Sequence, residues 1–197
     1  GMAMRLFTQL DGTDPRKYMQ DLVAQLEKHP RIKVFKDARV VLSRGSAGRF
    51  RSAISGADGI FPLEHGVTIL ATGGREAKIY ESGFCVHKSV MTHFGLEQKL
   101  ATGALDVGGL SAVAMIQCWR SRDGGERDYC SRICCPEMLK NVLTMKERKP
   151  DLPIFVFYRD IMTPGFLETY YTKARKAGVI FVRYDLDNPP KVAFADG

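Results

Sequence analysis

Apolar residues near the start of the chain recur at helical spacing. They share one face of a helix, on which Asp14 can act as the cap and Pro15 suits the first turn. The pattern predicts a helix over residues 15–29, which Pro30 ends. The residues of its apolar face are Tyr18, Met19, Leu22, Val23 and Leu26.

The next segment has the pattern of a β-hairpin. Residues 32–43 and 50–55 are predicted as strands, joined by a turn over 44–49 in which Gly45 and Gly48 supply the conformational freedom. Residues 56–66 are predicted as a loop. The run VTILATGG, residues 67–74, then predicts a buried strand that ends in a glycine turn.

The second half of the chain alternates strands and helices. Strands are predicted over 111–118, 153–160 and 179–185, and amphipathic helices over 136–150 and 165–178. Alternation of this kind is typical of a parallel sheet. The predicted fold class is therefore α/β, with a parallel βαβαβ lobe of FAD/NAD(P)-binding type preceded by a smaller mixed α+β lobe that contains the hairpin. We expect the lobes to span residues 1–105 and 106–197.

Composition narrows the function classes. The 197 residues are 45% hydrophobic, and no run approaches the roughly 18 apolar residues that a membrane span requires. The formal charge of +7 comes from scattered lysines and arginines without interleaved aromatic residues, so nucleic-acid binding is not predicted. No basic and apolar leader opens the chain, and we expect a cytoplasmic protein. No nucleophile stands beside a base, so no catalytic residue is assigned.

Four of the five cysteines lie within eighteen residues, in CWRSRDGGERDYCSRICC. Cys118 is expected at the carboxyl end of a parallel strand, where open α/β sheets place their ligands. Cys134 and Cys135 directly precede the helix that Pro136 is expected to start, and the positive end of a helix favours a thiolate. Strand end, loop and helix start, including Cys130 in the loop, can therefore meet at one point.

The spacing leaves several kinds of site open. Structural disulfides are disfavoured in a reducing compartment, and four unrelated core cysteines would rarely cluster in this way. Four thiolates suit zinc, but the paired C-x2-C of a zinc knuckle is absent, as is the C-x-x-C of a redox dithiol. An iron–sulfur cluster accepts adjacent cysteines more readily, because each can bind a different iron. Nearby arginines would stabilise its negative charge: Arg120, Arg122, Arg127 and Arg132.

Other polar residues carry weaker signals. Cys85 has no thiol nearby and is interpreted as an ordinary semi-buried cysteine. His65, His87 and His93 are interpreted as loop or surface residues, because their spacing suits neither a zinc helix nor a catalytic triad. Asp160 follows a predicted strand and lies either at the ligand-binding edge of the sheet or at a cap.

The cysteine segment and the YRDI that follows it resemble the A subunit of CoB–CoM heterodisulfide reductase, over roughly residues 66–187. The resemblance implies an iron–sulfur flavoprotein with a thioredoxin-reductase-like fold, in which a [4Fe-4S] cluster lies close to FAD. Carried over by position, the cluster ligands are Cys118, Cys130, Cys134 and Cys135. The ATGG turn is similar to a motif near the flavin in such proteins and implies FAD contacts at Thr72, Gly73 and Gly74.

The chain also departs from that family. No two glycines are separated by a single residue, so the G-x-G-x-x-G pyrophosphate fingerprint is absent. The family's N-terminal FAD-anchoring strand and its C-x2-C-x2-C clusters are missing too. We therefore expect an internal piece of a longer subunit that does not hold FAD tightly by itself.

The resemblance implies a function in electron transfer. The cluster would relay electrons between FAD and other redox centres, with the other subunits of a heterodisulfide-reductase-like complex and ferredoxin or hydrogenase-type donors as partners. One alternative is a structural or interaction domain, tied by zinc or free of metal. Another is a complete small flavoprotein.

Overall fold

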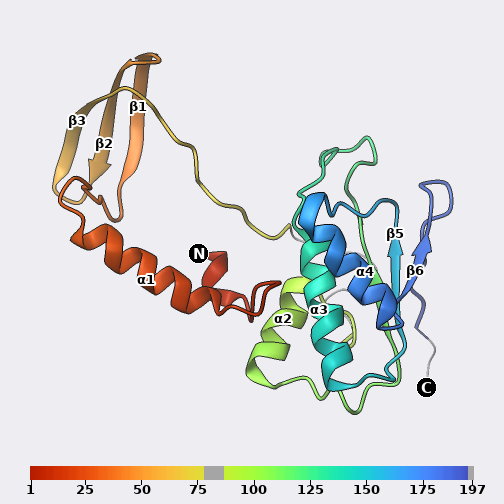
Figure 1. Cartoon of the computed structure of the whole chain (residues 1–197). Coiled ribbons are helices and arrows are strands. Elements are labelled where there is room, and N and C mark those ends of the chain that lie inside the picture. Colours follow the sequence, from red (N-terminus) through yellow and green to blue (C-terminus); the bar gives the residue numbers. More distant parts are fainter. Residues whose placement is uncertain (78–86, 195–197) are drawn as a thin grey trace. The chain divides into compact units, whose positions relative to one another are not determined.

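The computed structural model describes residues 1–77 and 87–194 (Figure 1). Their contacts divide the chain into two compact units, one made of Gly1–Arg16 with Glu76–Gly197 and the other of Lys17–Arg75. The contacts thus group residues 1–16 and the segment from residue 76 onward with the cysteine-bearing half. A functional boundary near residue 105 stays a prediction.

The hairpin predicted from the sequence is present in the unit Lys17–Arg75. Helix α1 (Pro15–Lys28) is followed by the strands β1 (Arg39–Ser46), β2 (Arg49–Gly56) and β3 (Gly59–His65). They form one antiparallel sheet in the order β1-β2-β3. The turn between β1 and β2 is made by Ala47 and Gly48, and Gly48 has the positive φ of 86° that such tight turns demand.

The predicted loop over residues 56–66 is wrong, because most of it forms strand β3. Its glycines and Pro62 suggested a loop. However, β3 lies at the edge of the sheet, where a proline can be placed without breaking a ladder hydrogen bond. Pro62 pairs with Ala53 of β2, and the strand continues to His65, which pairs with Phe50.

The buried strand predicted over residues 67–74 is also wrong. The segment belongs to no helix or strand, and its apolar residues are exposed, with 86% of Ile69 and 84% of Leu70 accessible. An apolar run forms a buried strand only if neighbouring strands pair with its backbone and other elements cover its faces. Within the described parts of the chain, no strand pairs with this segment.

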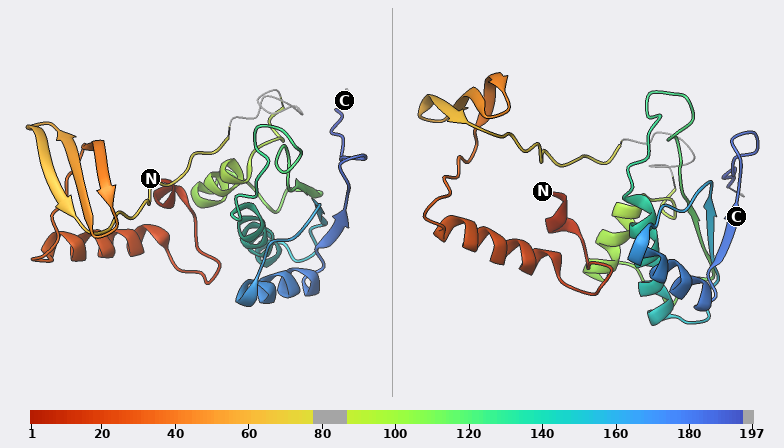
Figure 2. Two further views of the ribbon diagram at one scale, coloured as in Figure 1. Left: turned by 90° about the horizontal axis from the view of Figure 1, so that it is seen from above. Right: turned by 45° about the horizontal axis from the view of Figure 1, so that its top comes forward.

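The other unit contains the predicted βαβαβ arrangement, and the fold class is confirmed. Its elements are β4 (Val113–Ile116), α3 (Cys134–Arg148), β5 (Ile154–Tyr158), α4 (Glu168–Lys176) and β6 (Ile180–Arg183). The three strands are parallel in the order β4-β5-β6. The crossover helices α3 and α4 contact each other and lie on one face of the sheet (Figure 1, Figure 2). The short 3₁₀ helices η1 (Met2–Arg5) and η2 (Gly165–Leu167) complete this unit.

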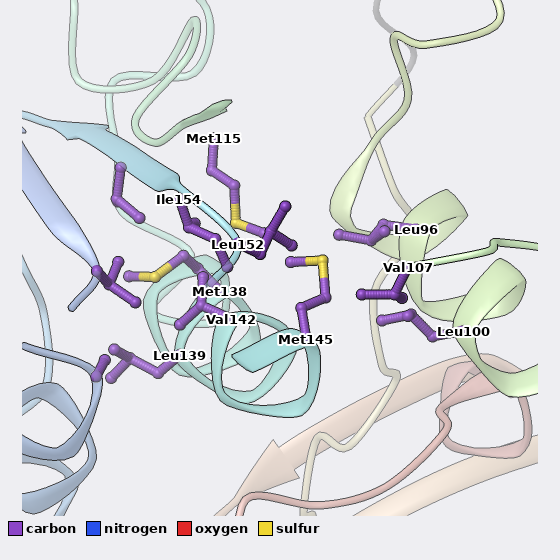
Figure 3. Close-up of a cluster of buried hydrophobic side chains, with 13 residues drawn as sticks. Leu96, Leu100, Val107, Met115, Met138, Leu139, Val142, Met145, Leu152 and Ile154 are labelled. Atoms are coloured by element: carbon purple, nitrogen blue, oxygen red, sulfur yellow. The ribbon is translucent and has the colours of Figure 1, made fainter. Parts of the chain in front are cut away.

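Helix α3 forms the centre of the hydrophobic core. Its side chains Met138, Leu139, Val142 and Met145 are fully buried, and Figure 3 shows them among residues of the sheet and of α2 (His93–Thr102). The sequence pattern did not identify α2. Thr92 caps it by accepting a hydrogen bond of 3.1 Å from the Gly95 N–H, and Gly103 ends it in a left-handed conformation.

Candidate metal centre

The carboxyl ends of the three parallel strands bring the candidate residues to one edge of the sheet. Cys118 follows β4, Asp160 follows β5, and Tyr184 comes directly after β6. The hydroxyl of Tyr184 donates a hydrogen bond of 2.6 Å to the main-chain carbonyl of Gln117, which fixes the exit of β4. The edge at which open α/β sheets bind ligands therefore carries the first cysteine of the motif.

Helix α3 brings the adjacent cysteines to the same place. It begins at Cys134, two residues before the expected start, so Cys134 and Cys135 lie in its first turn. Pro136 fits there because the first-turn N–H groups of a helix have no partner within the helix. Cys135 is buried, and Cys134 is partly accessible. Both thiols therefore lie at the positive end of the helix dipole.

The main-chain carbonyl oxygen of Asp160 connects the strand and the helix. It lies 4.0 Å from the Sγ of Cys118 and 3.9 Å from the Sγ of Cys135. The two sulfurs are consequently at most 7.9 Å apart, although the residues are 17 positions apart in the sequence. The structure thus brings Cys118 and Cys135 together around the end of β5.

Cys130 is linked to this group through its neighbours. Its Sγ accepts a hydrogen bond of 3.4 Å from the Arg132 N–H, and the hydroxyl of the intervening Ser131 lies 3.8 Å from the Sγ of Cys134. All four cysteines of the motif are free thiols. Cys85 lies outside the described residues.

The adjacent thiols differ in acidity. A hydrogen bond from Cys135, reinforced by Ser131, lowers the pKa of Cys134 to about 6. The same contact and burial raise the pKa of Cys135, because Cys135 supplies the proton that Cys134 accepts. The Sγ of Cys135 in turn accepts a hydrogen bond of 3.4 Å from the Met162 N–H. The pair therefore has one site ready to be a thiolate near neutral pH.

The backbone of the loop takes up an unusual conformation. Positive φ values occur at Cys118 (59°), Arg120 (51°), Arg122 (54°) and Arg132 (57°), and non-glycine residues adopt this region at a cost of about 1–2 kcal/mol each. Alternating left-handed residues turn successive N–H groups toward one side, an arrangement common around phosphates and iron–sulfur clusters. The loop conformation therefore suits an anionic group.

Arg159 holds this conformation, and the sequence analysis missed it. Its guanidinium donates to the carbonyls of Arg122 at 2.8 Å and Cys118 at 3.3 Å, and also to that of Ser121. These bonds direct three loop carbonyls toward Arg159. An arginine directly after a predicted parallel strand, in YRDI, was the signal available in the sequence.

The donor set fits an iron–sulfur cluster better than a single ion. A zinc ion needs four ligands within about 2.3 Å of one point. In residues 1–77 and 87–194, no three His, Cys, Asp or Glu side chains converge in that way. A [4Fe-4S] cluster spreads its four thiolates over separate irons and accepts N–H···S bonds such as those to Cys130 and Cys135.

The predicted flavin contacts belong to the other unit. Thr72, Gly73 and Gly74 are exposed, and Gly73 has a φ of 71°, as a glycine turn requires. A Cβ added at Gly73 or Gly74 would meet no atom within 4 Å. The assignment of these three residues to FAD stays a prediction.

The histidines have structural contacts. The Nε2 of His93 lies 2.7 Å from the Nε2 of Gln117, and burial lowers the pKa of the imidazole to about 4. His65 lies at the end of β3, where its Nε2 is 2.8 Å from the Ser52 hydroxyl. The prediction of a loop or surface position is thus wrong for His93, whose ring is packed at the start of α2.

Comparison with known proteins identifies relatives of this segment. No protein-family profile matches the chain. Over 137 residues it is 37% identical to the A subunit of the ferredoxin/F420H2-dependent CoB–CoM heterodisulfide reductase of Methanosarcina acetivorans, a match that covers 61% of this chain and 17% of the relative. The resemblance to the A subunit of heterodisulfide reductase is confirmed.

Two further relatives of the same type agree with this assignment. One is the A subunit of the H2:CoB–CoM heterodisulfide,ferredoxin reductase of Methanothermobacter marburgensis, 34% identical over 136 residues. The other is the first iron–sulfur A subunit of the CoB–CoM heterodisulfide reductase of Methanopyrus kandleri, 32% identical over 139 residues. Each match covers 61% of this chain and 21% of the relative. The chain thus spans about a fifth of the length of these relatives.

None of the helices in the described residues has the length and hydropathy of a membrane span.

Proposed function

We propose that this chain is an electron-transfer segment of an oxidoreductase of heterodisulfide-reductase type. Cys118, Cys130, Cys134 and Cys135 hold a [4Fe-4S] cluster that relays electrons between FAD and other redox centres. The observation that supports this most directly is the approach of Cys118 and Cys135 to the same carbonyl of Asp160. When bound, the cluster supplies one-electron chemistry without a proton transfer.

The residues of the chain hold and tune this site. The N–H groups of Arg132 and Met162 donate to the sulfurs of Cys130 and Cys135, and such bonds stabilise negative charge on a thiolate. The start of α3 adds a partial positive charge beside Cys134 and Cys135. Within this proposal the cysteines act as ligands, and no side chain acts as a nucleophile.

The wider assembly belongs to the same proposal. Thr72, Gly73 and Gly74 contact FAD, whose remaining contacts come from parts of the longer protein beyond this chain. The partners are other subunits of a heterodisulfide-reductase-like complex and ferredoxin or hydrogenase-type electron donors, in the cytoplasm. The names of the relatives, which mention ferredoxin, H2 and an iron–sulfur subunit, support this choice.

Anaerobic reconstitution with ferrous iron and sulfide tests the cluster. We expect the iron and acid-labile sulfide of one [4Fe-4S] cluster per chain, together with an electron paramagnetic resonance (EPR) signal after reduction with dithionite. Cys134→Ser removes a ligand and should lower the iron and sulfide content, whereas the matched control Cys85→Ser should leave it unchanged. Bound zinc without sulfide, or no metal after reconstitution, would support a zinc-tied or metal-free structural domain instead.

A further inference from the structure

Arg122 contacts a candidate cluster ligand through its side chain. Its Nη2 donates a hydrogen bond of 3.3 Å to the Sγ of Cys118, and its Nη1 donates one of 2.8 Å to the Oδ2 of Asp160. The Arg122 side chain is 27% exposed. The positive charge is therefore held against Cys118 in a partly desolvated position, where screening by water is weaker.

The position of this guanidinium is fixed from several directions. The main-chain N–H of Arg122 donates to the carbonyl of Arg127 at 3.0 Å, and its own carbonyl accepts the bond from Arg159. Its φ of 54° is unfavourable for an arginine and persists because the surrounding contacts hold it. The hydrogen bonds to Asp160 and Cys118 raise the pKa of Arg122, so its charge is permanent.

Asp160 cancels only part of that charge. Its carboxylate is 52% exposed, so water screens it more than it screens the guanidinium. The main-chain carbonyl of the same residue lies near the sulfurs of Cys118 and Cys135. The ion pair thus connects the end of β5 to the ligand that follows β4.

We propose that Arg122 is the residue that sets the reduction potential of the cluster, with Asp160 as the residue that positions it. Reduction adds one negative charge to a thiolate-ligated cluster, and a fixed cation beside Cys118 stabilises the reduced form more than the oxidised form. Arg122 therefore raises the potential. Asp160 keeps the cation in contact with the sulfur and moderates its effect. This inference rests on the proposed function.

An EPR-monitored redox titration of the reconstituted chain tests the proposal. We expect Arg122→Gln to shift the midpoint potential to a more negative value and Arg122→Lys, which keeps the charge but loses the fork, to give a smaller shift. Asp160→Asn retains an oxygen that can hold Arg122 and removes a negative charge, so it should shift the potential the other way. Arg127→Gln removes the same charge from the same loop and should shift the potential less than Arg122→Gln.

Three results would overturn the proposal. They are an unchanged or raised potential in Arg122→Gln, an equal shift in Arg127→Gln, or a lowered potential in Asp160→Asn. If Arg122→Gln does not assemble a cluster, the opposite-signed shift expected of Asp160→Asn still decides the matter. Failure of the proposed function is distinguishable, because the unmodified chain would then form no [4Fe-4S] cluster at all.

Discussion

The guanidinium of Arg159 donates a hydrogen bond of 2.8 Å to the main-chain carbonyl of Arg122, which lies 37 residues earlier in the chain. The bond joins the end of β5 to the loop that follows β4. With the bonds to the carbonyls of Cys118 and Ser121, it determines how the cysteine loop leaves the sheet. The geometry of the candidate site depends on this one side chain as much as on the cysteines themselves.

Arg159→Gln should loosen the cysteine loop. A hydrogen bond to a charged group contributes about 1.5–3 kcal/mol, and glutamine cannot reproduce the three-carbonyl contact. We expect faster proteolysis within residues 119–133 and a lower iron content after reconstitution. Arg183→Gln, at the exposed end of β6, is the matched control and should change neither. A loop in Arg159→Gln as resistant to protease as the unmodified loop would contradict this prediction.

The buried charges beside α3 predict a large loss of stability. Lys140 lies 2.5 Å from the Oε1 of Glu97 and 3.2 Å from the Oε2 of Glu137. Lys140→Met leaves both carboxylates without their cation, and breaking a buried pair costs about 3–5 kcal/mol. Urea denaturation followed by the fluorescence of Trp119, the single tryptophan, should show a lower free energy of unfolding for this variant.

Two further variants separate the charge from the packing. Lys140→Met with Glu97→Gln removes one of the stranded charges and should recover part of the lost free energy. Lys36→Met breaks the exposed pair with Glu27 and should leave the Trp119 transition unchanged. A loss from Lys140→Met no larger than that from Lys36→Met would show that the buried pair contributes little.

The buried imidazole of His93 predicts a pH-dependent stability. Its pKa is about 4 in the folded protein and about 6.5 when unfolded, so the unfolded chain binds more protons between these values. The contribution of His93 is complete above pH 6.5 and is lost as the pH falls toward 4, with a slope of up to about 1.4 kcal/mol per pH unit. Urea midpoints measured from pH 7 to 4.5 should show this slope.

Replacement of the imidazole tests its origin. His93→Gln keeps an oxygen that can accept from Gln117 and removes the titrating group, so its stability should vary less with pH over this range. His29→Gln, at an exposed position, should retain the slope of the unmodified chain. An identical pH dependence in His93→Gln and the unmodified chain would assign the slope to other groups.

Gly45 predicts a local effect in the hairpin. A Cβ at this position would lie 2.2 Å from the carbonyl oxygen of Arg49, and φ is 115°. Gly45→Ala should therefore weaken the pairing of β1 with β2 by more than the roughly 1–3 kcal/mol typical of backbone strain alone. Amide hydrogen exchange across the two strands would report this as lost protection.

Gly48→Ala is the control for that effect. Gly48 also has a positive φ, but a Cβ there meets no atom within 4 Å. This variant should lose less protection than Gly45→Ala. Equal losses would mean that φ alone, and not the approach of Arg49, decides the cost.

Periodicity predicted the elements whose burial is decided nearby. Helix α1, the β1–β2 hairpin and the strands and helices of the βαβαβ arrangement follow from repeats of 3.6 or 2 residues that each segment carries itself. The strand expected over residues 67–74 failed because its burial would require pairing with other strands. Strand β3 was missed because Pro62 is acceptable only at a sheet edge, and strand order cannot be read from a local pattern.

The amino-acid sequence alone was enough to predict the parallel arrangement, the relationship to the A subunit of heterodisulfide reductase and the four cysteines as candidate ligands. Side-chain type, spacing and hydrophobic period are properties of short stretches. The folded structure was needed to show that Cys118 and Cys135 meet at the carbonyl of Asp160, that Arg122 contacts the first sulfur, and that Arg159 shapes the loop. Those contacts join residues that are distant along the chain, and they exist because parallel strands end at the same edge of a sheet.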